Sequence, residues 1–98
     1  MTRIVVDYFF SPTSEECKNF MKLVVNPLMR ELGDSVEWRV HNIYDPRAKK
    51  LADQYAVRVV PTLVIAGKEI IAGFKPVNVV KEAIMRILGH ENDGCTSK

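Results

Sequence analysis

The stretch FFSPTSEECKNF, residues 9–20, decides how this chain is organised. Its first two residues end an apolar run, Arg3 to Phe10, which is rich in β-branched and aromatic side chains and is followed by a serine-proline turn signal. Such a run predicts a buried central strand. After the turn, Ser14 is a good N-cap, and two glutamates follow it where the helix dipole favours negative charge. A helix is therefore expected to begin at Ser14.

This helix is expected to run to Leu32, because Gly33 follows as a C-cap glycine. Pro27 lies inside the helix and should kink it. Five apolar residues are spaced so that they share one helix face, which should pack on the core: Phe20, Leu23, Val24, Leu28 and Leu32.

The rest of the chain predicts three more strands and two more helices. Residues 36–42 alternate between apolar and polar side chains, which is typical of a half-exposed strand near a sheet edge. The other predicted elements are a short helix from Asp45-Pro46 to about Tyr55, an apolar strand over 59–65, a hairpin strand over 69–72 and a last helix over 76–88 that ends at Gly89. The order is β-α-β-α-β-β-α, which predicts one α/β domain over residues 1–89, and the polar residues 90–98 are expected to form a flexible tail.

The composition suits one ordinary domain, with 98 residues and a net charge of +2. Lysines and arginines are scattered among acidic residues, which argues against a nucleic-acid surface. No apolar run is long enough to span a membrane, and the first residues lead straight into a strand, so neither an anchor nor a signal peptide is expected. The only cysteines are Cys17 and Cys95, too few for a disulfide scaffold, and the expected compartment is the reducing cytoplasm.

Two motifs, together with the order of elements, resemble the thioredoxin-like superfamily in its small, glutaredoxin-like form. Phe10 to Lys18 is similar to the family's lead-in to a C-x-x-C dithiol, and Tyr55 to Thr62 (YAVRVVPT) is similar to its cis-proline motif. The resemblance covers about residues 3–89. It implies a four-stranded mixed sheet in the order 2-1-3-4, flanked by helices, and a cis peptide bond before Pro61.

The resemblance also assigns roles to single residues, and one of these positions is changed. The family's nucleophilic cysteine corresponds to Ser14, and its resolving cysteine corresponds to Cys17. A serine hydroxyl cannot take part in thiol-disulfide exchange. The resemblance also implies a candidate proton relay at Asp7. The positions that it implies for substrate binding are Thr13, Val60, Pro61 and Gly73.

Three interpretations of Ser14 stay open. It is an engineered replacement of a cysteine, a natural change that leaves Cys17 as a lone weak thiol, or a natural N-cap beside a cysteine that only fills the core. Negative charge from Glu15 and Glu16 opposes the thiolate form of Cys17, and Lys18 compensates only partly, so a sluggish thiol is expected.

The predicted function is a thioredoxin- or glutaredoxin-like thiol-disulfide redox protein with Ser14 at the nucleophile position and little or no turnover. With a cysteine in place of Ser14 it would be a dithiol oxidoreductase. The alternative is a non-catalytic binding module that holds an extended peptide beside cis-Pro61. The expected partners are a protein disulfide substrate or a redox partner, either a reductase or glutathione. No cofactor, metal, nucleic acid or membrane is expected.

Two features bear on partners outside the site. Cys95 is not expected to replace the missing thiol, because the last helix leads away from the site and an extended tail could barely return. It could instead form a regulatory or intermolecular disulfide. The chain is expected to be a monomer, or a weak dimer that pairs through the edge strand over 36–42.

Overall fold

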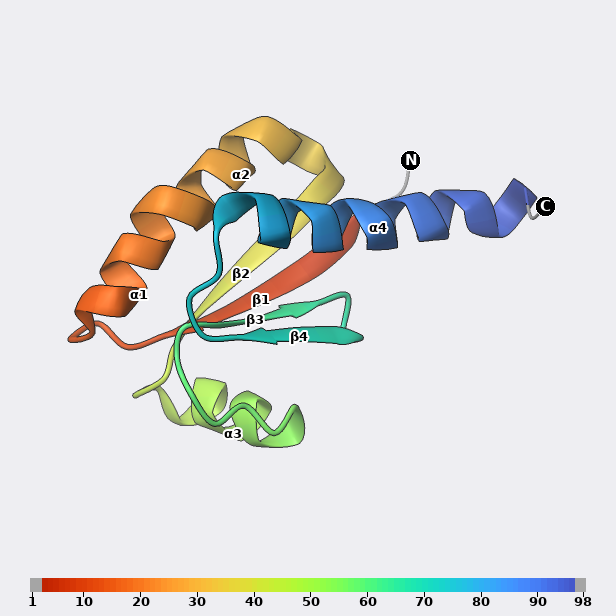
Figure 1. The fold of residues 1–98 in the computed structure, drawn as a ribbon. Coiled ribbons are helices and arrows are strands. Elements are labelled where there is room, and N and C mark those ends of the chain that lie inside the picture. Colours follow the sequence, from red (N-terminus) through yellow and green to blue (C-terminus); the bar gives the residue numbers. More distant parts are fainter. Residues whose placement is uncertain (1–2, 97–98) are drawn as a thin grey trace.

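A computed structural model describes the backbone of residues 3–96 and the side chains of residues 3–89 (Figure 1). The elements follow the predicted order. They are β1 (Ile4–Phe10), α1 (Glu15–Phe20), the π-helical turn η1 (Met21–Val25), α2 (Asn26–Leu32), the short 3-10 turn η2 (Gly33–Ser35), β2 (Val36–Asn42), α3 (Pro46–Gln54), β3 (Thr62–Ile65), β4 (Glu69–Ala72) and α4 (Val77–Thr96).

The four strands form one mixed sheet in the order β2-β1-β3-β4, which confirms the order expected from the sequence. β1 is central and pairs parallel with β2 and antiparallel with β3, and β4 pairs antiparallel with β3. β2 is an edge strand, as its alternating sequence predicted. The connection from β1 to β2 carries α1 and α2, so the first half of the chain is a β-α-β unit.

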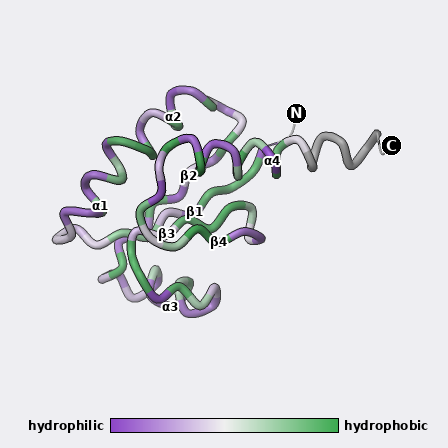
Figure 2. The backbone as a smooth tube through the Cα atoms, viewed as in Figure 1, coloured by the Kyte–Doolittle hydropathy of each residue, from purple (hydrophilic) through white to green (hydrophobic). Residues whose placement is uncertain are grey.

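Helices cover both faces of the sheet, with α1, α2 and α4 on one face and α3 on the other (Figure 1). Alternate residues of β1 serve the two faces: Val6 and Tyr8 belong to the larger core, and Phe9 belongs to the smaller core beneath α3. Figure 2 shows hydrophobic residues concentrated along β1 and β3, whereas the helices alternate between hydrophobic and hydrophilic positions. The sheet therefore separates a larger and a smaller hydrophobic core.

The first long helix departs from its predicted inner face at Leu23, which is 57% exposed. The cause is the π-helical turn before Pro27, where the Asn26 N–H donates to the carbonyl of Met21, five residues earlier. Proline has no N–H to donate, and the wider turn accommodates that loss. The extra residue rotates the helix face, so that Val24, Val25 and Leu28 are all buried while Leu23 faces solvent.

The strand predicted over 59–65 is shorter than expected, because β3 begins only at Thr62. Pro61 precedes the strand and has no N–H for the ladder, and Val59 is 50% exposed. The hairpin to β4 is as predicted. Ala66 and Gly67 both have positive φ, and the Lys68 N–H donates to the Ile65 carbonyl over 2.9 Å. Ile65 pairs with Glu69, so residues 66–68 form a tight hairpin turn.

The prediction that the last helix ends at Gly89 is wrong, since α4 continues to Thr96. Its predicted inner residues are correct: Val80, Ile84, Ile87 and Leu88 are buried, and Val77 packs against the core as a partly buried residue. The helix runs away from the end of the sheet where β1 meets α1 (Figure 1). The Cys95 side chain lies outside the described residues, and the mobility of residues 90–98 stays a prediction. Within the described part of the chain, no helix is apolar over a length that could cross a bilayer.

Candidate functional site

The two motifs of the sequence meet at one end of the sheet. Phe9 of β1 is paired with Thr62 of β3, so Pro61 lies opposite Phe10, the last residue before the turn into α1. The peptide bond between Val60 and Pro61 is cis. Because β1 leads directly into the turn at residues 11–14, the start of α1 and the residues before β3 lie at the same pole of the molecule (Figure 1).

Ser14 is the N-cap of α1, in the extended conformation that this position requires. Its Oγ accepts a hydrogen bond from the Cys17 N–H over 3.2 Å. A sulfur atom at residue 14 would face the same N–H at the positive end of the helix, which is the environment that stabilises a thiolate. The local geometry therefore suits a reactive thiol, although this chain places a hydroxyl there.

Cys17 lies one turn into the helix and is only 2% exposed. Its Sγ accepts a hydrogen bond from the Ser11 N–H over 3.4 Å, and its carbonyl accepts one from the Tyr8 hydroxyl over 3.0 Å. The thiol lines a pocket of about 370 Å³ whose wall includes Phe10 and Met21. Two sulfur positions are thus available, an outer one at residue 14 and an inner one at Cys17, and each faces a backbone N–H.

Tyr8 lies directly behind the inner position, and its side chain is fully buried. Burial raises the pKa of the Tyr8 hydroxyl, and negative charge on the Cys17 thiol and a hydrogen bond with it raise the pKa further. The hydroxyl is therefore held neutral, as a donor, well above the pH at which an exposed tyrosine ionises.

We expect this buried hydroxyl to make the fold sensitive to alkaline pH. An unfolded tyrosine loses its proton near pH 10, and Tyr8 in the folded chain keeps it to higher pH, so stability is present below pH 10 and is lost as the pH rises toward the folded pKa. Linkage gives a loss of about 1.4 kcal/mol between pH 8 and pH 11. Urea unfolding at both pH values should show this loss in the native protein and not in Tyr8→Phe, and an equal loss in both proteins would contradict the assignment.

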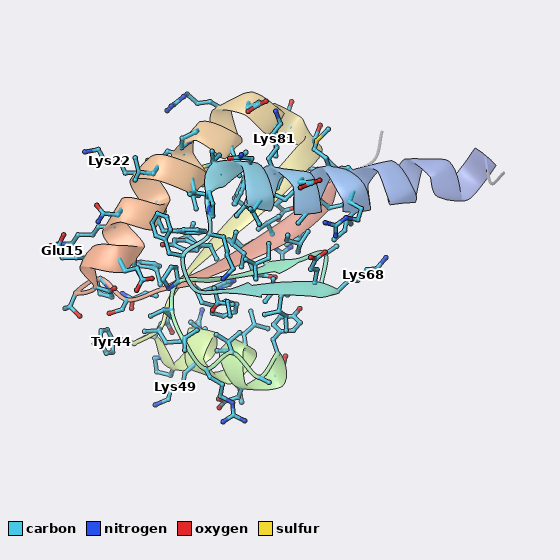
Figure 3. The ribbon with its side chains drawn as sticks, viewed as in Figure 1. Glu15, Lys22, Tyr44, Lys49, Lys68 and Lys81 are labelled. Atoms are coloured by element: carbon cyan, nitrogen blue, oxygen red, sulfur yellow. The ribbon has the colours of Figure 1, made fainter. Side chains whose placement is uncertain are left out.

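Thr13 belongs to a cluster of hydroxyl groups with Ser11 and Tyr44, of which the sequence predicted only Thr13 as a site residue. The Thr13 and Ser11 hydroxyls are 3.1 Å apart, and hydrogen bonds from Thr13 and then Ser11 lower the pKa of Tyr44. Tyr44 comes from the connection between β2 and α3 and is 67% exposed (Figure 3). Sequence gave no signal for Tyr44, because it lies thirty-one residues after Thr13 and reaches the site only through the fold.

Val60 and Gly73 are both predicted to contact substrate. Val60 precedes Pro61 in the chain, and Gly73 is hydrogen-bonded to the Pro61 backbone. The Gly73 N–H donates to the Pro61 carbonyl over 2.8 Å, and Gly73 has a φ of +84, which a residue with a side chain adopts only under strain. Among the residues that the structure describes, neither the N–H nor the carbonyl of Val60 has a hydrogen-bond partner. A free backbone donor and acceptor are what pairing with an extended chain requires.

Asp7, the candidate proton relay, is on the face of β1 opposite to Tyr8 and Cys17. Its Oδ1 lies 2.8 Å from His41 Nε2, and the His41 ring stacks on Phe9 with 4.9 Å between the ring centres. The strands bring this pair together over thirty-four residues of sequence. A relay role for Asp7 toward Cys17 stays a prediction. Among the described side chains, no three histidine, cysteine, aspartate or glutamate groups gather as metal ligands.

The matches found for this chain are solved structures. No protein-family model matches the chain, and no curated protein sequence matches it. A thioredoxin from Fasciola hepatica matches with a TM-score of 0.73 at 26% identity, over 86% of this chain and 80% of that one. A thioredoxin from Thermus thermophilus matches with a TM-score of 0.75 at 21% identity, over 98% and 84%. Thioredoxin O2 from Arabidopsis thaliana matches with a TM-score of 0.72 at 21% identity, over 89% and 76%.

Proposed function

Because the chain belongs by its fold to the thioredoxin-like superfamily, we propose that it is a thiol-disulfide redox protein whose nucleophile position is occupied by Ser14. The observation that carries the proposal is the pair of sulfur positions at the start of α1. Ser14 Oγ faces the Cys17 N–H at 3.2 Å, and Cys17 Sγ faces the Ser11 N–H at 3.4 Å. Each N–H can stabilise a negatively charged sulfur.

In this proposal the outer position attacks and the inner position resolves. An exposed thiolate at residue 14 would attack a disulfide of a partner, and the shielded Cys17 would then attack the mixed disulfide. Ser14 lacks the sulfur for the first step, so turnover is expected to be absent or very weak. The partner would be a protein disulfide or a cellular thiol reductant, and the proposal places the protein in the reducing cytoplasm. The proposal is tested by Ser14→Cys, with reduction of a protein disulfide as the measurement.

A second candidate function is peptide binding without chemistry, and the burial of Cys17 favours it. A thiol that is 2% exposed cannot meet a protein disulfide directly. The unpaired backbone of Val60 would instead hold an extended peptide by strand pairing, with the hydroxyls of Thr13 and Tyr44 nearby at the same pole. This function does not require sulfur at either position.

Two measurements test the binding module. In a Cys95→Ser background, Cys17 is expected to react with iodoacetamide at least tenfold more slowly in the folded protein than in urea, because buried thiols are shielded from reagents. A peptide selected for binding to the protein is expected to bind Cys17→Ala within about twofold of the native affinity, a change near the limit of what affinity measurements resolve.

The same peptide is expected to lose binding to Val60→Pro, which removes the backbone N–H, and to keep binding to Val60→Ala, the matched control. Rapid alkylation of Cys17 in the folded protein would contradict the burial on which this second candidate is based. Equal binding to both Val60 variants would show that the peptide does not pair with this backbone.

A further inference from the structure

A second pocket lies on the other face of the sheet, between the edge strand β2 and α3. It has a volume of about 500 Å³, which is within the range of small-molecule sites. Residues 40–42 of β2 line one side and residues 45–54 of α3 line the other. The pocket shares none of its lining residues with the pocket at Cys17, so the redox proposal leaves it unexplained.

His41 enters this pocket in a fixed orientation. Its Nε2 is 2.8 Å from Oδ1 of Asp7, whose side chain is 8% exposed, and its ring stacks on Phe9. A buried carboxylate that holds one ring nitrogen sets the orientation of the imidazole and leaves the other nitrogen for a ligand. Since Nε2 faces Asp7, Nδ1 is the nitrogen that remains.

The charged groups around the pocket favour an anion. Arg47 and Lys50 both line it, and neither forms an ion pair among the side chains of residues 3–89. Asp45 is the only carboxylate in the lining, and its Oδ1 is already the acceptor for the Arg47 N–H at the start of α3, over 2.9 Å. Unpaired cations beside an oriented imidazole are suited to a phosphate or carboxylate group.

The remaining lining indicates what else the ligand contains. Val40, which is 45% exposed, and Leu51 provide apolar surface, and the side-chain amide of Gln54 provides a polar group. An inorganic phosphate ion has five non-hydrogen atoms, and at the ~30 Å³ that one water molecule takes up in the liquid they would fill only about 150 Å³ of this pocket. A ligand that fills the pocket therefore combines an anionic group with an apolar body.

We propose that the β2–α3 pocket, defined by Val40, His41, Arg47, Lys50, Leu51 and Gln54, binds a small organic anion. Arg47 and Lys50 pair with its phosphate or carboxylate group. His41 in its protonated form donates from Nε2 to Asp7 and from Nδ1 to the anion, and the apolar part of the ligand lies against Val40 and Leu51. Asp7 acts as a positioning residue through His41. This site works independently of the sulfur positions at the start of α1.

The test uses phenyl phosphate and benzoate as probes. Each is titrated into the full-length protein at low salt, and binding is measured from the changes in backbone amide chemical shifts. Saturable binding with a millimolar or lower Kd is expected for one or both probes, with shifts at Asn42 and Gln54, and neutral phenol should bind more weakly. If phenyl phosphate alone binds, the ligand carries phosphate, and if benzoate alone binds, it carries carboxylate. Absence of saturable binding by both probes would overturn the proposal.

Two lysines on the same helix provide a matched pair of variants. Lys50 lines the pocket, whereas its neighbour Lys49 does not and projects from α3 away from the sheet (Figure 3). Loss of a charge-assisted hydrogen bond predicts that Lys50→Gln raises the Kd about tenfold, while Lys49→Gln changes it by less than about twofold. Equal weakening by both variants would show a nonspecific effect of net charge and would also overturn the proposal. Neither result changes the activity expected of Ser14→Cys, so the pocket proposal and the redox proposal are tested separately.

Discussion

Ser14→Cys, made in a Cys95→Ser background, is expected to convert the protein into a dithiol that reduces insulin with dithiothreitol as the reductant. The new thiol would lie at the N-cap of α1 and face the Cys17 N–H. There the helix dipole lowers a thiol pKa from about 8.5 toward about 7, which raises the thiolate fraction at pH 7 from about 3% to about half. Because the nucleophilicity of a thiolate falls as its pKa falls, about fivefold of this roughly sixteenfold gain is lost, and we expect its reaction with a disulfide reagent to be about threefold faster than that of an ordinary cysteine.

The reduction of insulin uses the two sulfur atoms of this variant, one at residue 14 and one at Cys17. The new thiolate attacks an insulin disulfide, forms a mixed disulfide and releases one insulin thiol. Cys17 then attacks the sulfur at residue 14, releases the second insulin thiol and leaves an intramolecular disulfide, which dithiothreitol reduces. The unmodified protein cannot form the first mixed disulfide, so its insulin reduction should equal the rate with dithiothreitol alone.

Two controls show whether the pair of positions acts as proposed. Ser14→Cys combined with Cys17→Ala keeps the attacking sulfur and lacks the resolving one, so without dithiothreitol it should stop at the mixed disulfide with insulin. With dithiothreitol present, that reagent must resolve the mixed disulfide in place of Cys17, so the variant should turn over more slowly than Ser14→Cys. Ser14→Ala should be inactive and should lose about 1 kcal/mol of stability because the N-cap is gone. If Ser14→Cys in the Cys95→Ser background is folded and reduces insulin no faster than the unmodified protein, the redox proposal is wrong. The β2–α3 pocket proposal would be unaffected.

Leu28→Ala is expected to destabilise the fold by about 3–5 kcal/mol, while Leu23→Ala should cost less than about 0.5 kcal/mol. Both leucines belong to the same long helical segment, and the sequence places both on its inner face. In the structure Leu28 is completely buried and Leu23 is 57% exposed. Truncation of a buried leucine loses its transfer free energy and leaves a cavity, whereas truncation of an exposed one does neither.

Urea unfolding monitored by circular dichroism measures both free energies. Because the two variants make the same chemical change in one helical segment, differences in helix propensity largely cancel between them. Similar losses in the two variants would mean that Leu23 is buried, and that the π-helical turn η1 does not rotate the helix face as described.

Much of the architecture follows from local sequence patterns. The β-branched run that ends at Phe10, the cap at Ser14 and the alternation over residues 36–42 each specify an element through nearby residues, and β1, α1 and β2 form as these patterns predict. The strand order followed from the resemblance to a known family. The composition of the site at the start of α1, Ser14 followed by Cys17, was also readable directly.

Tertiary structure alone decided which distant groups meet. Asp7 has His41 as its partner because β1 and β2 pair parallel, in a register that no local pattern encodes. Tyr44 reaches the hydroxyls of Ser11 and Thr13 because the connection after β2 ends at the same pole as the turn into α1.

The exposure of Leu23 could not be predicted from helical periodicity. Helical periodicity assumes 3.6 residues per turn, and on that assumption Leu23 belongs to the core. The backbone instead forms a wider turn ahead of Pro27, because proline cannot donate the next hydrogen bond, and the register of the inner face shifts. Sequence alone therefore determined that a helix forms here, and only the structure shows, through the π-helical turn ahead of Pro27, which of its residues face the sheet.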